Sequence, residues 1–85
     1  MEITAYTLLG CSHCKTLREL FKRAGTEYTE IMVKRDMTLE DFSASYPHIS
    51  SFPFVVIDGN EVGDLVAVVK LFVAKGLVSS SKKSE

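Results

Sequence analysis

The feature that most constrains this chain is a pair of cysteines placed where a strand-like segment gives way to a helix-like one. Cys11 and Cys14, the only two cysteines among 85 residues, enclose Ser12 and His13 in a C-x-x-C motif. Two thiols at this spacing can form a disulfide within one helical turn. A helix N-terminus beneath them supplies N–H groups and a positive dipole end, which favour thiolate over thiol. The sequence therefore predicts a redox centre at residues 11–14.

Two other roles for the cysteine pair stay open at this point. A structural disulfide would close so short a loop that chain entropy contributes only about 2 kcal/mol. Structural zinc takes four ligands, whereas the motif supplies two thiolates and the only histidines are His13 and His48. Because C-x-x-C beside a βαβ pattern is itself typical of redox motifs, the redox interpretation is favoured and no metal site is expected.

The size and charge of the chain limit what else it can do. Eighty-five residues make one small domain, and a hydrophobic content of 46% is enough for a core. A net charge of −1 gives no basic field for nucleic acid. The first residues show no signal-peptide pattern, and the longest mostly apolar stretch, residues 65–74, is too short to span a bilayer. We expect a cytoplasmic monomer with no membrane or nucleic-acid partner.

Hydrophobic periodicity and turn signals predict seven segments of regular structure. Apolar residues recur at helical spacing from Ser12 to Ala24, and Gly25 follows as a C-terminal cap. The dipeptide Asp58-Gly59, after a β-branched apolar run, indicates a hairpin. Strands are expected at residues 3–9, 27–33, 54–57 and 60–62, and helices at residues 12–24, 39–46 and 65–75.

The order of these segments predicts an α/β fold, βαβ followed by ββα. A right-handed parallel crossover would join the first two strands, and a hairpin would complete a four-stranded mixed sheet with helices on both faces. The last segment is rich in valine, which favours a strand, but its length and the caps Asp64 and Gly76 favour a helix. Residues 1–78 would form the domain and residues 79–85 a polar, disordered tail. Cys11 would lie just beyond the end of the first strand, where open α/β sheets place their chemistry.

From about residue 3 to residue 77 the chain resembles the glutaredoxins, short members of the thioredoxin-fold superfamily. Three features carry the resemblance: the strand–C-x-x-C–helix opening, Ser51-Phe52-Pro53 before the third strand, and the closing segment at residues 58–65. The family typically shows C-P-Y-C, T-V-P and a double glycine at these places. This chain has Ser12-His13 between its cysteines, Gly63-Asp64 in place of the double glycine, and Leu8 where a basic residue is common.

The resemblance implies a role for each residue of the motif. Cys11 would be the nucleophile and Cys14, one turn inside the helix, the resolving thiol. His13 would border the glutathione site. A C-x-H-C arrangement also resembles that of strongly oxidising thioredoxin-fold proteins, in which the histidine stabilises the thiolate; an ordinary solvated histidine is the alternative.

The resemblance also implies a binding site for glutathione. A cis bond before Pro53 would turn the backbone of Phe52 toward the sulfur, where it would pair with glutathione as a strand adds to an edge; a strand-initiating trans proline is the alternative. Gly63 and Asp64 match the site for the γ-glutamyl end, although Asp64 also fits an ordinary N-cap. Candidates for the glycyl carboxylate are the basic residues Lys15, Arg18, Lys34 and Arg35.

The function implied is that of a glutathione-dependent thiol–disulfide oxidoreductase. Its substrates would be protein disulfides and glutathione mixed disulfides, with glutathione as co-substrate and no tightly bound cofactor. One alternative is a redoxin specific for ribonucleotide reductase and recharged by thioredoxin reductase. Another, of a different class, is a carrier of a glutathione-ligated [2Fe–2S] cluster.

Overall fold

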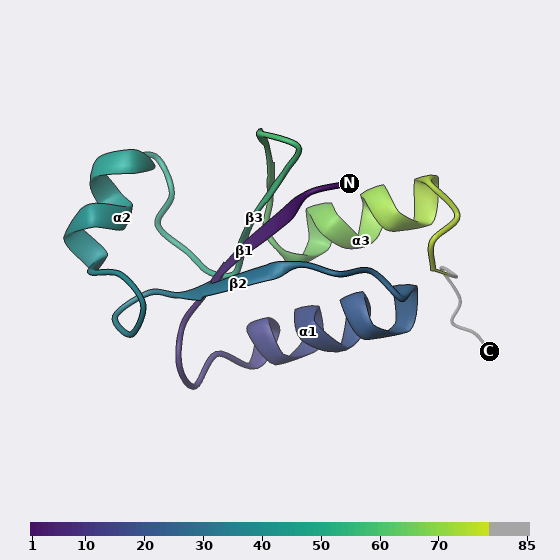
Figure 1. Ribbon diagram of the computed structural model, residues 1–85, viewed down its shortest axis with the longest axis horizontal. Coiled ribbons are helices and arrows are strands. Elements are labelled where there is room, and N and C mark those ends of the chain that lie inside the picture. Colours follow the sequence, from purple (N-terminus) through teal and green to yellow (C-terminus); the bar gives the residue numbers. More distant parts are fainter. Residues whose placement is uncertain (79–85) are drawn as a thin grey trace.

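All seven expected elements are present in the computed structural model, which describes residues 1–78 (Figure 1). The predicted tail, residues 79–85, lies outside the described part. The first strand ends earlier than predicted, because the chain turns at residues 9–10, with Gly10 at a φ of 78°. The second strand begins and ends within the predicted range. The elements are β1 Ile3–Thr7, α1 Ser12–Ala24, β2 Thr29–Met32, α2 Leu39–Ser45, β3 Phe54–Ile57, β4 Asn60–Gly63 and α3 Leu65–Ala74.

The four strands form one mixed sheet in the order β2-β1-β3-β4, which confirms the predicted topology. β1 pairs with β2 in parallel and with β3 antiparallel, and β4 pairs antiparallel with β3. The C-terminal ends of β1 and β2 therefore lie at the same edge of the sheet as the N-terminal end of β3. This edge brings together three loops that are far apart in the sequence.

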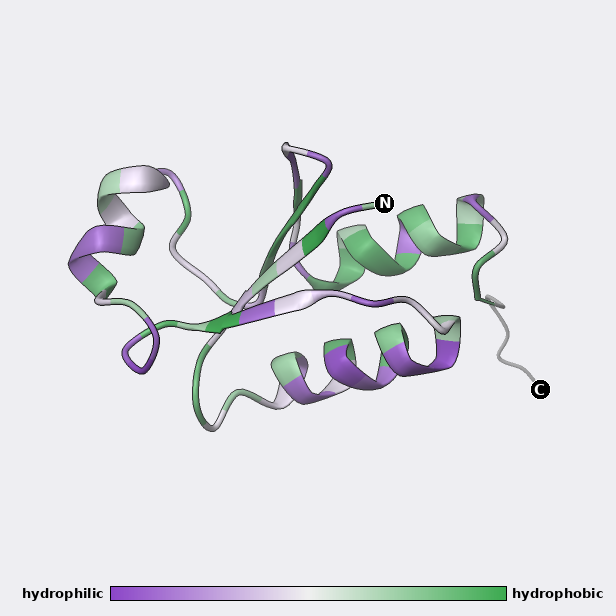
Figure 2. Ribbon diagram, in the orientation of Figure 1, coloured by the Kyte–Doolittle hydropathy of each residue, from purple (hydrophilic) through white to green (hydrophobic). Residues whose placement is uncertain are grey.

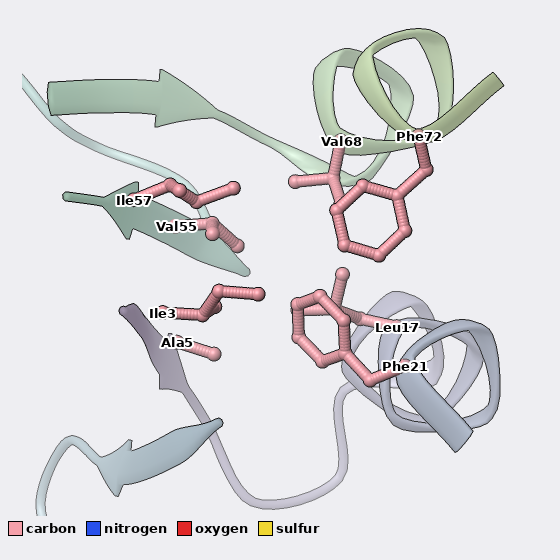
Figure 3. Close-up of a cluster of buried hydrophobic side chains, with 8 residues drawn as sticks. All are labelled: Ile3, Ala5, Leu17, Phe21, Val55, Ile57, Val68 and Phe72. Carbon is pink, nitrogen blue, oxygen red and sulfur yellow. The ribbon is translucent and has the colours of Figure 1, made fainter. Parts of the chain in front are cut away.

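One face of the sheet is covered by α1 and α3 together. Alternate residues of β1 and β3 point toward these two helices, whose own buried side chains lie opposite them (Figure 3). The helix side chains include Leu17 and Phe21 of α1 and Phe72 of α3, none of which is exposed to solvent. This packing fixes the N-terminal ends of both helices relative to β1. The core residues drawn in Figure 3 are Ile3, Ala5, Leu17, Phe21, Val55, Ile57, Val68 and Phe72.

The opposite face of the sheet carries α2 and an aromatic cluster. The ring of Tyr6 lies 5.2 Å from that of Phe42, 5.5 Å from that of Tyr46 and 5.9 Å from that of Phe54. Burial, with a contribution from Tyr46, raises the pKa of Tyr6 to about 12. Helices thus cover both faces of the sheet, and α2 stands apart from the other two (Figure 1).

The valine-rich segment α3 is a helix and not a strand, and its N-terminal cap contributes to this. Asp64 precedes the helix in extended backbone, and its carboxylate accepts a hydrogen bond of 3.1 Å from the N–H of Ala67. Tertiary burial adds to this cap, since Val68 and Phe72 are inaccessible to solvent. These two contributions outweigh the strand preference of the valines, and the helix predicted from the caps is confirmed. Most of α3 is apolar in Figure 2, whereas α1 has a hydrophilic outer side.

Candidate active site

Cys11 is the N-cap residue of α1. Its backbone is extended (φ −88°, ψ 115°), and its Sγ accepts a hydrogen bond of 3.2 Å from the N–H of Cys14. The sulfur thus stands where Ser, Thr, Asp or Asn usually caps a helix and satisfies one of the free N–H groups of the first turn. A thiolate is the better acceptor for such a bond, and the helix dipole acts in the same direction. The side chain remains partly exposed, so its sulfur can meet a substrate.

Cys14 lies one turn further along and differs from Cys11 in its surroundings. It is inaccessible to solvent, and both cysteines are free thiols. Burial foremost, then the hydrogen bond with Cys11, raises the pKa of Cys14 to about 11, against the opposing effects of a backbone hydrogen bond with Leu8 and of the charge of Arg18. One thiol of the pair is therefore accessible and the other is buried and protonated at neutral pH. Such a pair can divide the tasks of attacking a substrate and resolving the product.

The loop before β3 reaches the same edge of the sheet. The Phe52–Pro53 peptide bond is cis, as the resemblance implied. The carbonyl oxygen of Phe52 lies 3.9 Å from the Sγ of Cys11. A backbone carbonyl beside the sulfur is available to a substrate peptide that arrives in extended form.

A groove runs from His13 past the Phe52–Pro53 loop to the start of α3. It measures about 280 Å³ and brings together His13, Phe52, Pro53 and Asp64. A second groove of about 310 Å³ shares Pro53 and Asp64 and adds Gly63. All five non-cysteine residues predicted for the glutathione site thus line two adjoining grooves on one side of Cys11. We refer to them together as the Pro53 groove.

Gly63 occupies a position that other residues fit poorly. Its φ is 124°, in the left-handed region, and a Cβ there would lie 3.3 Å from the Cβ of Ala67. Its neighbour Asp64 is the N-cap of α3, which confirms the capping role predicted as one alternative for that residue. A role for its carboxylate toward a ligand remains a prediction.

The basic residues near the site differ in their availability. Arg18 donates from Nε and Nη2 to the carboxylate of Glu30 at 2.8–3.1 Å, and Arg35 forms an ion pair of 2.9 Å with Asp36. Arg18 is thereby committed to β2, which argues against the carboxylate-binding role considered for it. Lys15 and Lys34 form no ion pair within residues 1–78.

The ion pair of Arg18 belongs to a network that the sequence did not predict. Thr7, which is inaccessible to solvent, donates from its hydroxyl to Glu30 at 2.7 Å. Arg18 foremost, and then Thr7, lowers the pKa of the Glu30 carboxyl. The network ties α1 to the C-terminal end of β1 and to β2, one turn beyond Cys14. A polar residue at the end of a strand was its only signal in the sequence. His48, to which no role was assigned, contacts Glu61 of β4 at 2.5 Å.

Among residues 1–78, no group of three or more His, Cys, Asp or Glu side chains could hold a metal ion. In the same part of the chain, no helix has both the length and the apolar character needed to cross a bilayer.

Fold and site together define a thioredoxin-like domain with a C-x-x-C motif at the start of its first helix. The family model for glutaredoxin matches residues 3–62, which is most of the chain. The protein therefore belongs to the glutaredoxin family, as the resemblance of its motifs implied. A search of the curated proteins gave no match.

Solved glutaredoxins share the fold. Glutaredoxin 1 from Francisella tularensis, complexed with cacodylate, is 21% identical with a TM-score of 0.70, over 89% of this chain and 95% of that one. A buckwheat glutaredoxin–glutathione complex is 19% identical with a TM-score of 0.76, over 88% and 71%. The glutaredoxin from Brucella melitensis is 25% identical with a TM-score of 0.68, over 98% and 94%.

Replacing Glu30 by Gln should reduce stability in a pH-dependent way. Because the folded pKa of Glu30 is lowered, its contribution is fully present above the unfolded pKa of about 4.3 and is lost as the pH falls through the folded value. We expect the variant to lose about 1 kcal/mol of unfolding free energy at pH 7, and the difference to shrink below about pH 4. Urea denaturation across this range measures it.

The matched control is Glu19→Gln, which changes an exposed glutamate of α1 and should leave stability almost unchanged. A difference between the wild type and Glu30→Gln that stayed constant down to pH 2 would show that the carboxylate charge contributes nothing.

Proposed function

We propose that this protein is a glutathione-dependent thiol–disulfide oxidoreductase, which reduces protein disulfides and glutathione mixed disulfides through Cys11 and Cys14. The observation that carries the proposal is the accessible Sγ of Cys11, capped by the Cys14 N–H at 3.2 Å and bordered by the Pro53 groove. Membership of the glutaredoxin family supports the same chemistry.

Reduction of a glutathione mixed disulfide needs only Cys11. Its thiolate attacks the glutathione sulfur, a bond forms between these two sulfurs, and the protein thiolate leaves and takes up a proton. A second glutathione thiolate then attacks the glutathione sulfur bound to Cys11, which releases oxidised glutathione and restores the Cys11 thiolate. In total one free glutathione is consumed, and the oxidised glutathione that leaves joins it to the glutathionyl group of the substrate.

Reduction of a protein disulfide uses both cysteines. Cys11 attacks one sulfur of the substrate and forms a mixed disulfide with it, while the other substrate sulfur leaves as a thiolate. Cys14 loses its proton and attacks the Sγ of Cys11, which releases the second substrate thiolate and leaves an intramolecular disulfide. Two glutathione molecules then reduce that disulfide. The raised pKa of Cys14 keeps it protonated, and so unreactive toward solvent oxidants, until this step.

The Pro53 groove is the proposed binding site for glutathione. The backbone of Phe52 would pair with the cysteinyl residue of the tripeptide, and the N-terminal N–H groups of α3 would receive its γ-glutamyl carboxylate. Asp64, at the same helix end, would meet the γ-glutamyl ammonium, and His13 closes the other side of the groove. The similar buckwheat protein was solved as a glutathione complex, which supports this assignment.

A variant with Cys14 replaced by Ser tests the proposal. We expect it to keep most of the turnover of a glutathionylated peptide, with glutathione and glutathione reductase as the electron supply, because Cys11 alone carries that cycle. Reduction of an intramolecular protein disulfide should fall at least about tenfold, since no resolving thiol remains. Cys11→Ser is the control and should lose both activities.

Loss of both activities in Cys14→Ser would overturn this division of roles. Turnover by the wild type with thioredoxin reductase, but not with glutathione, would instead identify the redoxin that is recharged by thioredoxin reductase.

A second prediction concerns His13, which is exposed at the second position of α1 and lies in the wall of the Pro53 groove. As the resemblance to C-x-H-C proteins implies, a histidine at this position would stabilise the thiolate of Cys11 and with it the reduced protein. We expect the reduction potential of His13→Tyr to be more negative than that of the wild type by about 30 mV, which corresponds to about 1.4 kcal/mol. Equilibration with glutathione redox buffers, followed by thiol trapping, measures the shift.

His48→Tyr serves as the control, because the contact of His48 with Glu61 lies on the surface of β4 and the potential should not change. An unchanged potential in His13→Tyr would mean that this histidine is only a solvated surface residue.

A further inference from the structure

Another groove lies on the opposite side of Cys11 from the Pro53 groove. It measures about 500 Å³ and is formed where β1 and β2 end, so it lies on the β2 side of β1, whereas the Pro53 groove lies on the β3 side. We call it the Leu9 groove. Its lining residues are Leu8, Leu9, Met32, Val33, Lys34 and Arg35.

The lining of the Leu9 groove is largely apolar. Met32 and Val33 are buried, with 8% and 1% of their surface exposed, and form the inner side. Leu9 is 87% exposed, more than any other large apolar side chain within residues 1–78. Figure 2 shows this connection between β1 and α1, and the end of β2 beside it, in the green of hydrophobic residues. Because β1 ends at Thr7, the fold itself does not require an apolar side chain at position 9.

The rim of the Leu9 groove is cationic and well defined. Lys34 adopts a positive φ of 76°, and its N–H donates to the carbonyl of Met37 at 2.6 Å. The carboxylate of Asp36 accepts the Met32 N–H at 2.9 Å as well as the guanidinium of Arg35. These bonds hold the turn in place. With Asp36 and Arg35 paired, one net positive charge, that of Lys34, remains on the rim.

We propose that the Leu9 groove docks the protein substrates of Cys11. The occupant is an extended segment of the substrate protein. It carries an apolar side chain two residues from its reacting cysteine and an acidic side chain three residues from that cysteine. Leu9 and Cys11 are two residues apart and so at most about 7 Å, which is also the span of two residues in an extended peptide. A substrate sulfur at Cys11 can therefore place the second residue along its chain beside Leu9, and the third toward the rim that carries Lys34.

This proposal rests on the proposed function and names the class of substrate that it serves. With the proposed glutathione site on the β3 side, a glutathionylated protein can present its glutathione half there and its polypeptide half to the Leu9 groove. Lys34, a candidate above for the glycyl carboxylate of glutathione, is assigned in this proposal to the acidic side chain of the protein substrate. Selectivity among proteins would then depend on Leu9 and Lys34, while turnover of small disulfides would not need Leu9.

The test compares glutathione mixed disulfides of three symmetric peptides, which remove any question of chain direction. The first is Glu-Leu-Gly-Cys-Gly-Leu-Glu, the second has Ser for both Leu, and the third has Lys for both Glu. For the wild-type chain we expect kcat/KM to be about tenfold higher for the first than for either other peptide, an effect of about 1.4 kcal/mol. Leu9→Ser should remove the advantage of the first peptide over the second.

Leu77→Ser is the matched control, because Leu77 is also exposed (37%) but follows α3 at the far end of that helix. It should leave the peptide preference intact. Hydroxyethyl disulfide, a small substrate without a side chain for the groove, should be turned over equally well by the wild type and Leu9→Ser. A peptide preference that survives in Leu9→Ser, or an equal loss with the small substrate, overturns the docking site.

A binding measurement separates this proposal from the proposed function. The first peptide with Ser for Cys, labelled with a fluorophore, should bind the wild type about tenfold more tightly than Leu9→Ser in fluorescence anisotropy, with no redox step involved. If this difference is found but glutathione supports no turnover, the docking site stands and the proposed function falls. Equal affinity for both proteins overturns the docking site whatever the activity.

Discussion

The hydrogen bond from the Cys14 N–H to the Sγ of Cys11 joins the local structure of this protein to its chemistry. An N-cap acceptor is worth about 1 kcal/mol to a helix, and here a sulfur takes that position. The same geometry exposes the sulfur to the positive end of α1, which contributes at most about 2 kcal/mol toward a negative charge. The helix therefore begins at the accessible cysteine, and its next turn buries the second thiol.

The sheet supplies the rest of the site because of its strand order. β1 lies between β2 and β3, so the residue that follows β1 has a loop on either side. The β3 side presents the backbone of Phe52 and the start of α3, and the β2 side presents Lys34 and an apolar lining. The ion pair between Arg18 and Glu30, joined by Thr7, fixes α1 against this edge. Cys11 thus lies between two surfaces of different chemistry.

Much of this arrangement follows from the sequence, and the part that does not has a physical reason. Periodicity and caps predict α1 and the valine-rich α3, because local hydrogen bonds such as Asp64 to Ala67 favour one form of the backbone. The apolar pattern predicts the end of β1 two residues too late, since Leu8 and Leu9 continue it into a turn.

Contacts between distant residues leave no such local pattern in a single sequence. The spacing of Arg18 and Glu30 in the sequence does not predict their ion pair. The exposure of Leu9 likewise has no signal in the apolar pattern, which continues through residue 9. The five binding residues on the β3 side are predicted from three motifs that occur in the same order as in the glutaredoxins, and all five line the Pro53 groove. A set of motifs in order indicates the fold, whereas no single residue does.

The most direct test is the site and rate of alkylation of the reduced protein by iodoacetamide, followed by peptide mass mapping. At pH 6, Cys11 should react faster in the folded protein than in the urea-unfolded chain, because folding supplies the Cys14 N–H and the helix end. Cys14, buried and with its pKa raised to about 11, should stay unmodified until the protein unfolds. Equal rates at Cys11 in the folded and unfolded states, or modification of Cys14 first, would contradict the assignment of Cys11 as the activated nucleophile.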